Sequence, residues 1–126
     1  MLKIALAAGA GGFAGTVARF LASRYLQGLI SSSFPLGTFL VNLAGCFLIG
    51  LLYGIFARTD AVSPEWKVFL TAGFCGGLTT FSTFTAENIA LLKDGSFFHF
   101  ALYTGLSVFL GLLATFLGQA VVTKIL

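Results

Sequence analysis

Polar and charged residues of this chain gather in short clusters, and long apolar runs lie between them. A helix needs about 20 apolar residues to cross the hydrocarbon core of a bilayer. By that measure the chain contains four crossings, which we place at about residues 4–25, 35–57, 68–92 and 97–123. Pro35 marks the start of the second one, because proline is favoured in the first turn of a helix. The pattern predicts an all-α integral membrane protein, with residues 1–126 forming a single four-helix transmembrane domain.

The third run contains the weakest helix-forming sequence of the chain, GFCGGLTTFSTF at residues 73–84. It combines three glycines within five residues with the β-branched Thr79, Thr80 and Thr83. An unpaired backbone group in hydrocarbon costs several kcal/mol, so an interrupted helix needs partners for its free N–H and C=O groups. Freed carbonyls suit a cation, and the N-terminus of a half-helix suits an anion. We therefore predict a broken third helix that forms an ion site; a simple kink that admits a neighbouring helix is the alternative.

Composition strengthens the membrane assignment. Hydrophobic residues make up 58% of the chain and charged residues only 9%, against about 25% in soluble domains. The net charge of +3 comes from bases that flank the apolar runs, which indicates anchors at the membrane edge rather than nucleic-acid binding. Cys46 and Cys75 lie inside apolar runs and are expected to act as small hydrophobic residues. No arrangement typical of a catalytic site is found in the sequence, so we do not expect an enzyme.

The charges give little information on orientation. Four crossings place both termini on one side of the membrane, and the bases are divided almost equally between the two sides. One side has Lys3, Arg58, Lys67 and Lys124, and the other has Arg24, Lys93 and, deeper, Arg19. Such a chain could insert both ways up and pair with an inverted copy of itself, as inverted repeats do within one transporter. A single orientation set by other features remains the alternative.

Two phenylalanines in the unusual stretch are candidates for an anion path. Phe81 and Phe84 are three residues apart and share one face of a helix. The edge of an aromatic ring is positive and attracts a small anion weakly, which suits conduction because the ion must also leave. Ser82 and Thr83 lie between the rings and could donate hydroxyl groups along the same route. Contact with lipid or core is the simpler interpretation of the two rings.

Polar residues within membrane spans are functional candidates by default, and here they include Thr38, Asn42, Glu87, Arg19, Tyr103 and Ser107. The amide of Asn42 could face an anion or bond to another helix, and Thr38 precedes it by one turn. Glu87 is the one acid within a span and is expected to meet water or a partner. Arg19 could draw anions to a pore mouth or extend to the interface.

Tyr103 and Ser107 share a face of the fourth helix, since they are four residues apart, and could bond into the same route.

At the level of motifs the chain resembles the Fluc (CrcB) family of fluoride channels. The resemblance rests on GGFAGTVARF, FPLGTFLVNLAGCFLIG, GFCGGLTTFSTF and YTGLS, which occur in this order and cover all four spans. It implies a dual-topology, antiparallel homodimer in the cell (inner or plasma) membrane. Such a dimer has two pores, exports fluoride passively and lowers its cytoplasmic concentration, which confers fluoride resistance.

The resemblance also implies roles for individual residues. Phe81, Phe84 and Asn42 would line the pores. Ser82 and Thr83 would form a polar track, bordered by Tyr103 and Ser107 and close to Glu87. Main-chain carbonyls of Gly76 and Thr79, two from each subunit, would hold a structural sodium ion at the dimer centre.

Two other classes of function stay open. A proton-coupled small multidrug-type transporter also has four short spans and dual topology, but it needs an ionisable group in its binding chamber, for which only Glu87 is available. A purely structural membrane subunit would carry no flux.

Overall fold

A computed structural model describes residues 1–125, and every regular element in that range is a helix. The elements are α1 (Leu2–Gln27), α2 (Leu36–Phe56), α3 (Pro64–Val68), the π-helix η1 (Phe69–Cys75), α4 (Gly76–Leu78), α5 (Phe81–Lys93) and α6 (Phe97–Ile125). Because α3, η1, α4 and α5 follow one another along one path, they form a composite third crossing. It and the other three long helices are long and apolar enough to span a membrane. The predicted all-α fold with four spans is confirmed.

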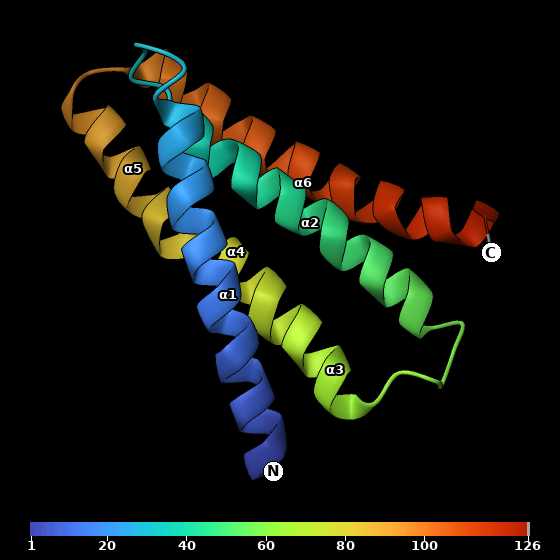
Figure 1. Ribbon diagram of the computed structural model, residues 1–126. Coiled ribbons are helices and arrows are strands. Elements are labelled where there is room, and N and C mark those ends of the chain that lie inside the picture. Colours follow the sequence, from blue (N-terminus) through green and yellow to red (C-terminus); the bar gives the residue numbers. More distant parts are fainter. Residues whose placement is uncertain (126) are drawn as a thin grey trace.

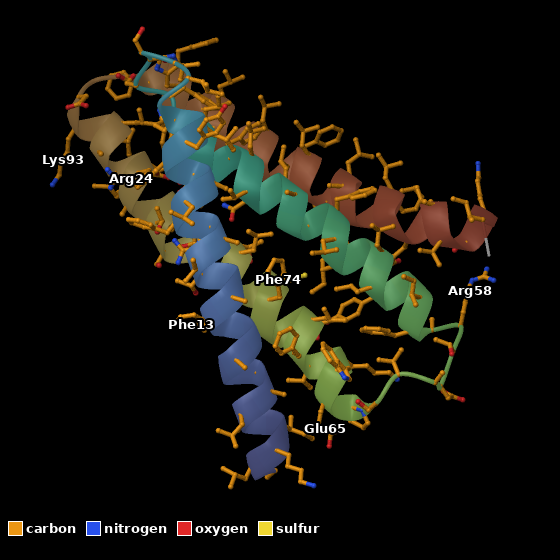
Figure 2. The ribbon with its side chains drawn as sticks, viewed as in Figure 1. Phe13, Arg24, Arg58, Glu65, Phe74 and Lys93 are labelled. Atoms are coloured by element: carbon orange, nitrogen blue, oxygen red, sulfur yellow. The ribbon has the colours of Figure 1, made fainter. Side chains whose placement is uncertain are left out.

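The four crossings are arranged as two packed pairs (Figure 1). α1 crosses the composite third crossing, and α2 lies along α6. Figure 2 places Arg24 and Lys93 towards one end of the molecule and Arg58 and Glu65 towards the other. At the second end a guanidinium nitrogen of Arg58 donates to the Thr123 carbonyl at 3.2 Å, which ties the α2–α3 link to the last turns of α6. The links between successive crossings therefore lie at alternate ends of the molecule, as expected of a chain that crosses four times.

The third crossing is interrupted at the predicted place. Thr79 (φ −95°, ψ 157°) and Thr80 (φ −150°, ψ 123°) have extended backbones between α4 and α5. The Thr80 hydroxyl accepts the N–H of Thr83 at 3.2 Å and so caps the new helix. The prediction of a broken third helix is confirmed. The π-helical turn before the break was not predicted; such turns often occur near functional sites.

Glycines allow the helices of each pair to approach closely. A Cβ added at Gly11 would collide with the Phe69 carbonyl oxygen of η1, and one added at Gly15 would collide with the Phe74 carbonyl. In the other pair, Gly50 and Gly118 pack against the backbone of the facing helix in the same way. In lipid the hydrophobic effect does not drive helices together, and close packing at small residues provides the attraction instead.

Replacing Gly11 with alanine is expected to destabilise the protein by about 1–3 kcal/mol, the usual cost of inserting a methyl group into a packed interface. Gly9→Ala is the matched control in the same helix, because a Cβ at Gly9 has no neighbour within 4 Å. Thermal unfolding in detergent, followed by loss of the folded species on size exclusion, measures the difference. Equal midpoints for the two variants would contradict the packing described for α1 and η1.

A small apolar core fixes the second half of the third crossing. Phe39 of α2, Leu91 of α5 and Tyr103 of α6 form one buried cluster. Tyr103 is fully buried, with 0% of its surface exposed. The cluster holds α5 against α2 and α6, so the residues that follow the break have a defined position.

Candidate functional site

An open groove of about 340 Å³ runs along the break in the third crossing. Its walls come from α2, from the segment around the break, from the first turn of α5 and from α6. The lining residues are Asn42, Gly45, Cys46, Ile49, Cys75, Gly76, Thr79, Thr80, Phe81, Phe84, Ser107 and Val108. Most of the lining is apolar, so the few polar groups that reach the groove determine its chemistry.

The amide of Asn42 pairs with the backbone of the break. Its Nδ2 donates to the Thr80 carbonyl at 3.2 Å, and its Oδ1 accepts the Thr80 N–H at 2.8 Å. The extended conformation of Thr80 removes both groups from helical bonding, and the side-chain amide replaces those bonds. Of the two interpretations of Asn42 left open by the sequence, the structure shows the bond between helices, at a residue that also lines the groove.

The two phenylalanine rings stand together in the groove wall. The ring centroids of Phe81 and Phe84 are 5.7 Å apart, with the planes tilted by 36°. Phe84 also packs on Tyr103, with 4.9 Å between centroids. Phe81 remains 76% exposed. The predicted shared face is therefore present, with one ring anchored on α6 and the other at the open side.

Glu87 joins three helices through its two carboxyl oxygens. Thr38 on α2 donates its hydroxyl to one oxygen at 3.0 Å, and Tyr103 on α6 donates to the other at 2.8 Å. Thr38 is 6% exposed and Tyr103 is buried. The expectation that this acid meets a partner is met by two hydroxyl groups.

Ser107 supplies the free hydroxyl of the groove. Its Oγ is buried and has no hydrogen-bond partner among the described residues. It lines the same groove as Phe84 and Asn42. A buried polar atom without a partner is costly unless water or a ligand satisfies it.

The carbonyls before the break differ in their partners. Nε of Arg19 donates to the Gly77 carbonyl at 2.9 Å, so this side chain reaches the break rather than the membrane edge. Within residues 1–125, the carbonyls of Gly76 and Thr79 accept no hydrogen bond. Gly76 is exposed, and both residues line the groove.

Ser82 and Thr83 are placed differently from the other candidates. Ser82 is exposed and its carbonyl accepts the Thr85 hydroxyl, while the backbone N–H of Thr83 completes the Thr80 cap. Neither residue is among those that line the groove of one chain.

Two residues were not singled out as site residues by the sequence reasoning. Thr80 caps α5, and its backbone pairs with Asn42. Threonine is a favoured residue at the N-terminal cap of a helix, so its place just before the second half of the crossing could have indicated this role. Asn88 is 6% exposed and forms a hydrogen bond with Thr104 of α6. In the sequence it follows Glu87 directly, and the charged residue was the one chosen as a candidate.

The fold and the groove define a class: a small membrane protein of four crossings whose interrupted third crossing contributes backbone and aromatic side chains to a groove within the span. A family model described as "CrcB-like protein, Camphor Resistance (CrcB)" matches residues 6–119. The chain belongs to the CrcB family, and the resemblance seen in the sequence motifs is confirmed.

Similar proteins carry a functional name. A protein of Flavobacterium psychrophilum is 45% identical over 115 residues, covering 91% of this chain and 93% of the relative. One from Chlorobium phaeobacteroides is 47% identical over 90% of this chain and 88% of its own length. One from Escherichia coli O7:K1 is 47% identical over 92% and 87%. All three are named "Fluoride-specific ion channel FluC", and an ion channel is not an enzyme.

Proposed function

We propose that the protein is a fluoride-specific ion channel that lets fluoride leave the cell passively. The proposal is carried by the break, where the Asn42 amide pairs with the Thr80 backbone beside the Phe81–Phe84 pair, in a chain closely similar to proteins named as fluoride channels. The break held by the Asn42 amide places two aromatic rings and a free hydroxyl along one groove. These are weak partners for an anion, and weak partners permit both entry and exit.

Fluoride is small and strongly hydrated, so a path for it must replace water with several modest donors. The positive edges of Phe81 and Phe84, the unpaired Ser107 hydroxyl and the second N–H of the Asn42 amide are such donors. An arginine or lysine in the same place would form a charge-assisted bond and hold the ion. Arg19, a base near the break, is engaged with the Gly77 carbonyl.

A second copy of the chain completes the path in this proposal. The groove is open on one side, where Gly76 and the 76%-exposed Phe81 lie. An exposed glycine beside an exposed ring is a surface on which another helix can pack closely. The near-equal division of bases between the two ends allows the partner to be inverted. An antiparallel homodimer then has two grooves and so two pores.

A structural sodium ion fits the break. Carbonyl oxygens are suitable ligands for a dehydrated alkali cation, and those of Gly76 and Thr79 accept no hydrogen bond from the described residues. One chain supplies two such oxygens, and an inverted partner would supply two more. When bound, the ion would neutralise carbonyl dipoles that otherwise lie bare within the span, and it would not itself be transported.

Efflux from liposomes tests the function. Purified protein is reconstituted in vesicles loaded with both potassium fluoride and potassium chloride, and ion-selective electrodes follow the two anions after addition of valinomycin. Rapid fluoride release with negligible chloride release is expected. Equal release of both anions, or no release as a structural subunit would give, overturns the proposal.

Glu87→Gln separates a channel from a proton-coupled carrier. The glutamine keeps an acceptor for Tyr103 but cannot bind and release a proton. A channel should therefore still pass fluoride. One altered hydrogen bond should slow it by no more than about tenfold. A proton-coupled carrier should lose transport entirely. Efflux is measured with and without an imposed pH gradient; a dead variant, or a wild-type flux that needs the gradient, would favour the carrier.

A further inference from the structure

The second half of the third crossing needs its own means of orientation. Two extended residues separate α4 from α5, so α4 does not fix how far α5 is turned about its axis. α5 packs mainly on α6, with a smaller contact to α2. Whatever sets the rotation of α5 on α6 also sets the direction in which Phe84 points.

Asn88 and Thr104 form a buried polar link between these two helices. The Thr104 hydroxyl donates to Oδ1 of Asn88 at 3.1 Å, and Nδ2 of Asn88 donates to the Phe84 carbonyl at 3.1 Å. Asn88 is 6% exposed, so leaving either amide group unpaired would be costly. One side chain therefore connects α6 to the backbone of the residue that bears the groove ring.

This link lies beside the Glu87–Tyr103 bond, one residue further along each helix. Two adjacent bonds between the same helices resist rotation, because a turn of α5 that lengthens one must distort the other. Phe84 packs on Tyr103 at 4.9 Å and lies one turn before Asn88. Neither Asn88 nor Thr104 lines the groove, and their hydrogen bonds connect them to it through the backbone of Phe84.

We propose that Asn88 and Thr104 are positioning residues that fix the rotation of α5 and aim the Phe84 ring into the groove. The inference rests on the proposed fluoride conduction and adds two residues to the part of the chain that supports it. The bond from Asn88 to the Phe84 carbonyl lies within α5 and by itself would be only local. The bond that Asn88 accepts from the Thr104 hydroxyl connects it to α6.

Thr104→Val keeps the shape of the side chain and removes the donor. We expect it to slow fluoride efflux from liposomes by about fivefold, as loss of one buried hydrogen bond predicts, while the reconstituted protein remains dimeric. Thr104→Ser keeps the hydroxyl and should restore the wild-type rate. Should the valine variant not assemble, Thr104→Ala is measured in its place with the same expected slowing.

Thr115→Val is the matched control. Thr115 is also on α6 and donates its hydroxyl across a helix interface, to the Cys46 carbonyl at 3.0 Å and within its own helix to Gly111. It does not contact α5 through these bonds, so fluoride efflux should be unchanged. Equal slowing by Thr104→Val and Thr115→Val would mean that any lost interhelical bond has this effect, and would overturn the inference.

A double variant shows whether Thr104 acts through the ring. In a Phe84→Ile background, Thr104→Val should add little further slowing, since the ring that it positions is gone. Fully multiplicative effects would contradict the inference, and so would an unchanged rate in Thr104→Val alone. If wild-type protein releases no fluoride, the proposed function itself fails; wild-type release that Thr104→Val does not alter refutes the positioning role alone.

Discussion

Phe81→Ile and Phe84→Ile are each expected to slow fluoride efflux by about tenfold or more, which corresponds to a barrier raised by about 1.4 kcal/mol. Isoleucine keeps an apolar side chain of similar bulk but has no ring and therefore no positive edge to offer an anion. Both rings line the groove, and their centroids are only 5.7 Å apart. An ion passing them would lose one of two successive partners in either variant.

Phe13→Ile is the matched control for both variants. Phe13 is 75% exposed, and Figure 2 shows it pointing away from the other helices. Its replacement should leave the fluoride rate and the assembly state unchanged. Size exclusion must show the same assembly state for all three variants as for the unaltered protein, because the claim concerns conduction and not assembly. Wild-type rates in both groove variants would refute the role given to the ring edges.

Asn42→Leu is the second change with a large expected effect. It leaves the partly buried N–H and carbonyl of Thr80 without partners, at up to about 1–3 kcal/mol for each group. The break should then lose its fixed geometry. We expect both a lower unfolding temperature and fluoride efflux close to that of empty liposomes.

Gln27→Leu separates the two consequences of that change. Gln27 makes the same kind of amide pair, with its Nε2 on the Phe34 carbonyl at 2.9 Å and its Oε1 on the Gly37 N–H at 3.0 Å. This pair lies at the α1–α2 turn, away from the break. The control should lose stability but retain fluoride efflux per folded protein. If the Asn42 variant also retains its rate per folded protein, the amide has a structural role only.

The features of the fold that depend on local chemistry could be predicted from the sequence. Apolar runs of sufficient length predict the four crossings, and the glycines and threonines around Gly76 and Thr79 predict the interruption. The break can be predicted without knowing which residues lie near it, because glycine and threonine are poor helix formers. The free backbone groups at the break must then find partners, since they lie inside hydrocarbon. Glu87 could likewise be expected to meet a partner because an isolated acid in a span is costly.

The pairing of particular side chains could not be predicted, because it depends on how the crossings are arranged. Asn42 and Thr80 are 38 positions apart, and nothing local to either one indicates the other. Arg19 could be given two destinations from its sequence position, and it reaches a third, the Gly77 carbonyl, because α1 crosses the third crossing at that point. Ser82 and Thr83 share a sequence motif with the two rings but are not among the residues that line the groove of one chain, because neighbours on a helix differ in direction by about 100°.

Reversal potential tests the central claim most directly, namely that the broken crossing forms a passive path for fluoride. Purified protein is inserted in a planar bilayer with a fluoride gradient across it and equal chloride on both sides. We expect a current whose reversal potential equals the equilibrium potential of fluoride. That reversal potential should not change when a chloride or proton gradient is added. A reversal potential that follows chloride or protons, or the absence of any current, would contradict it.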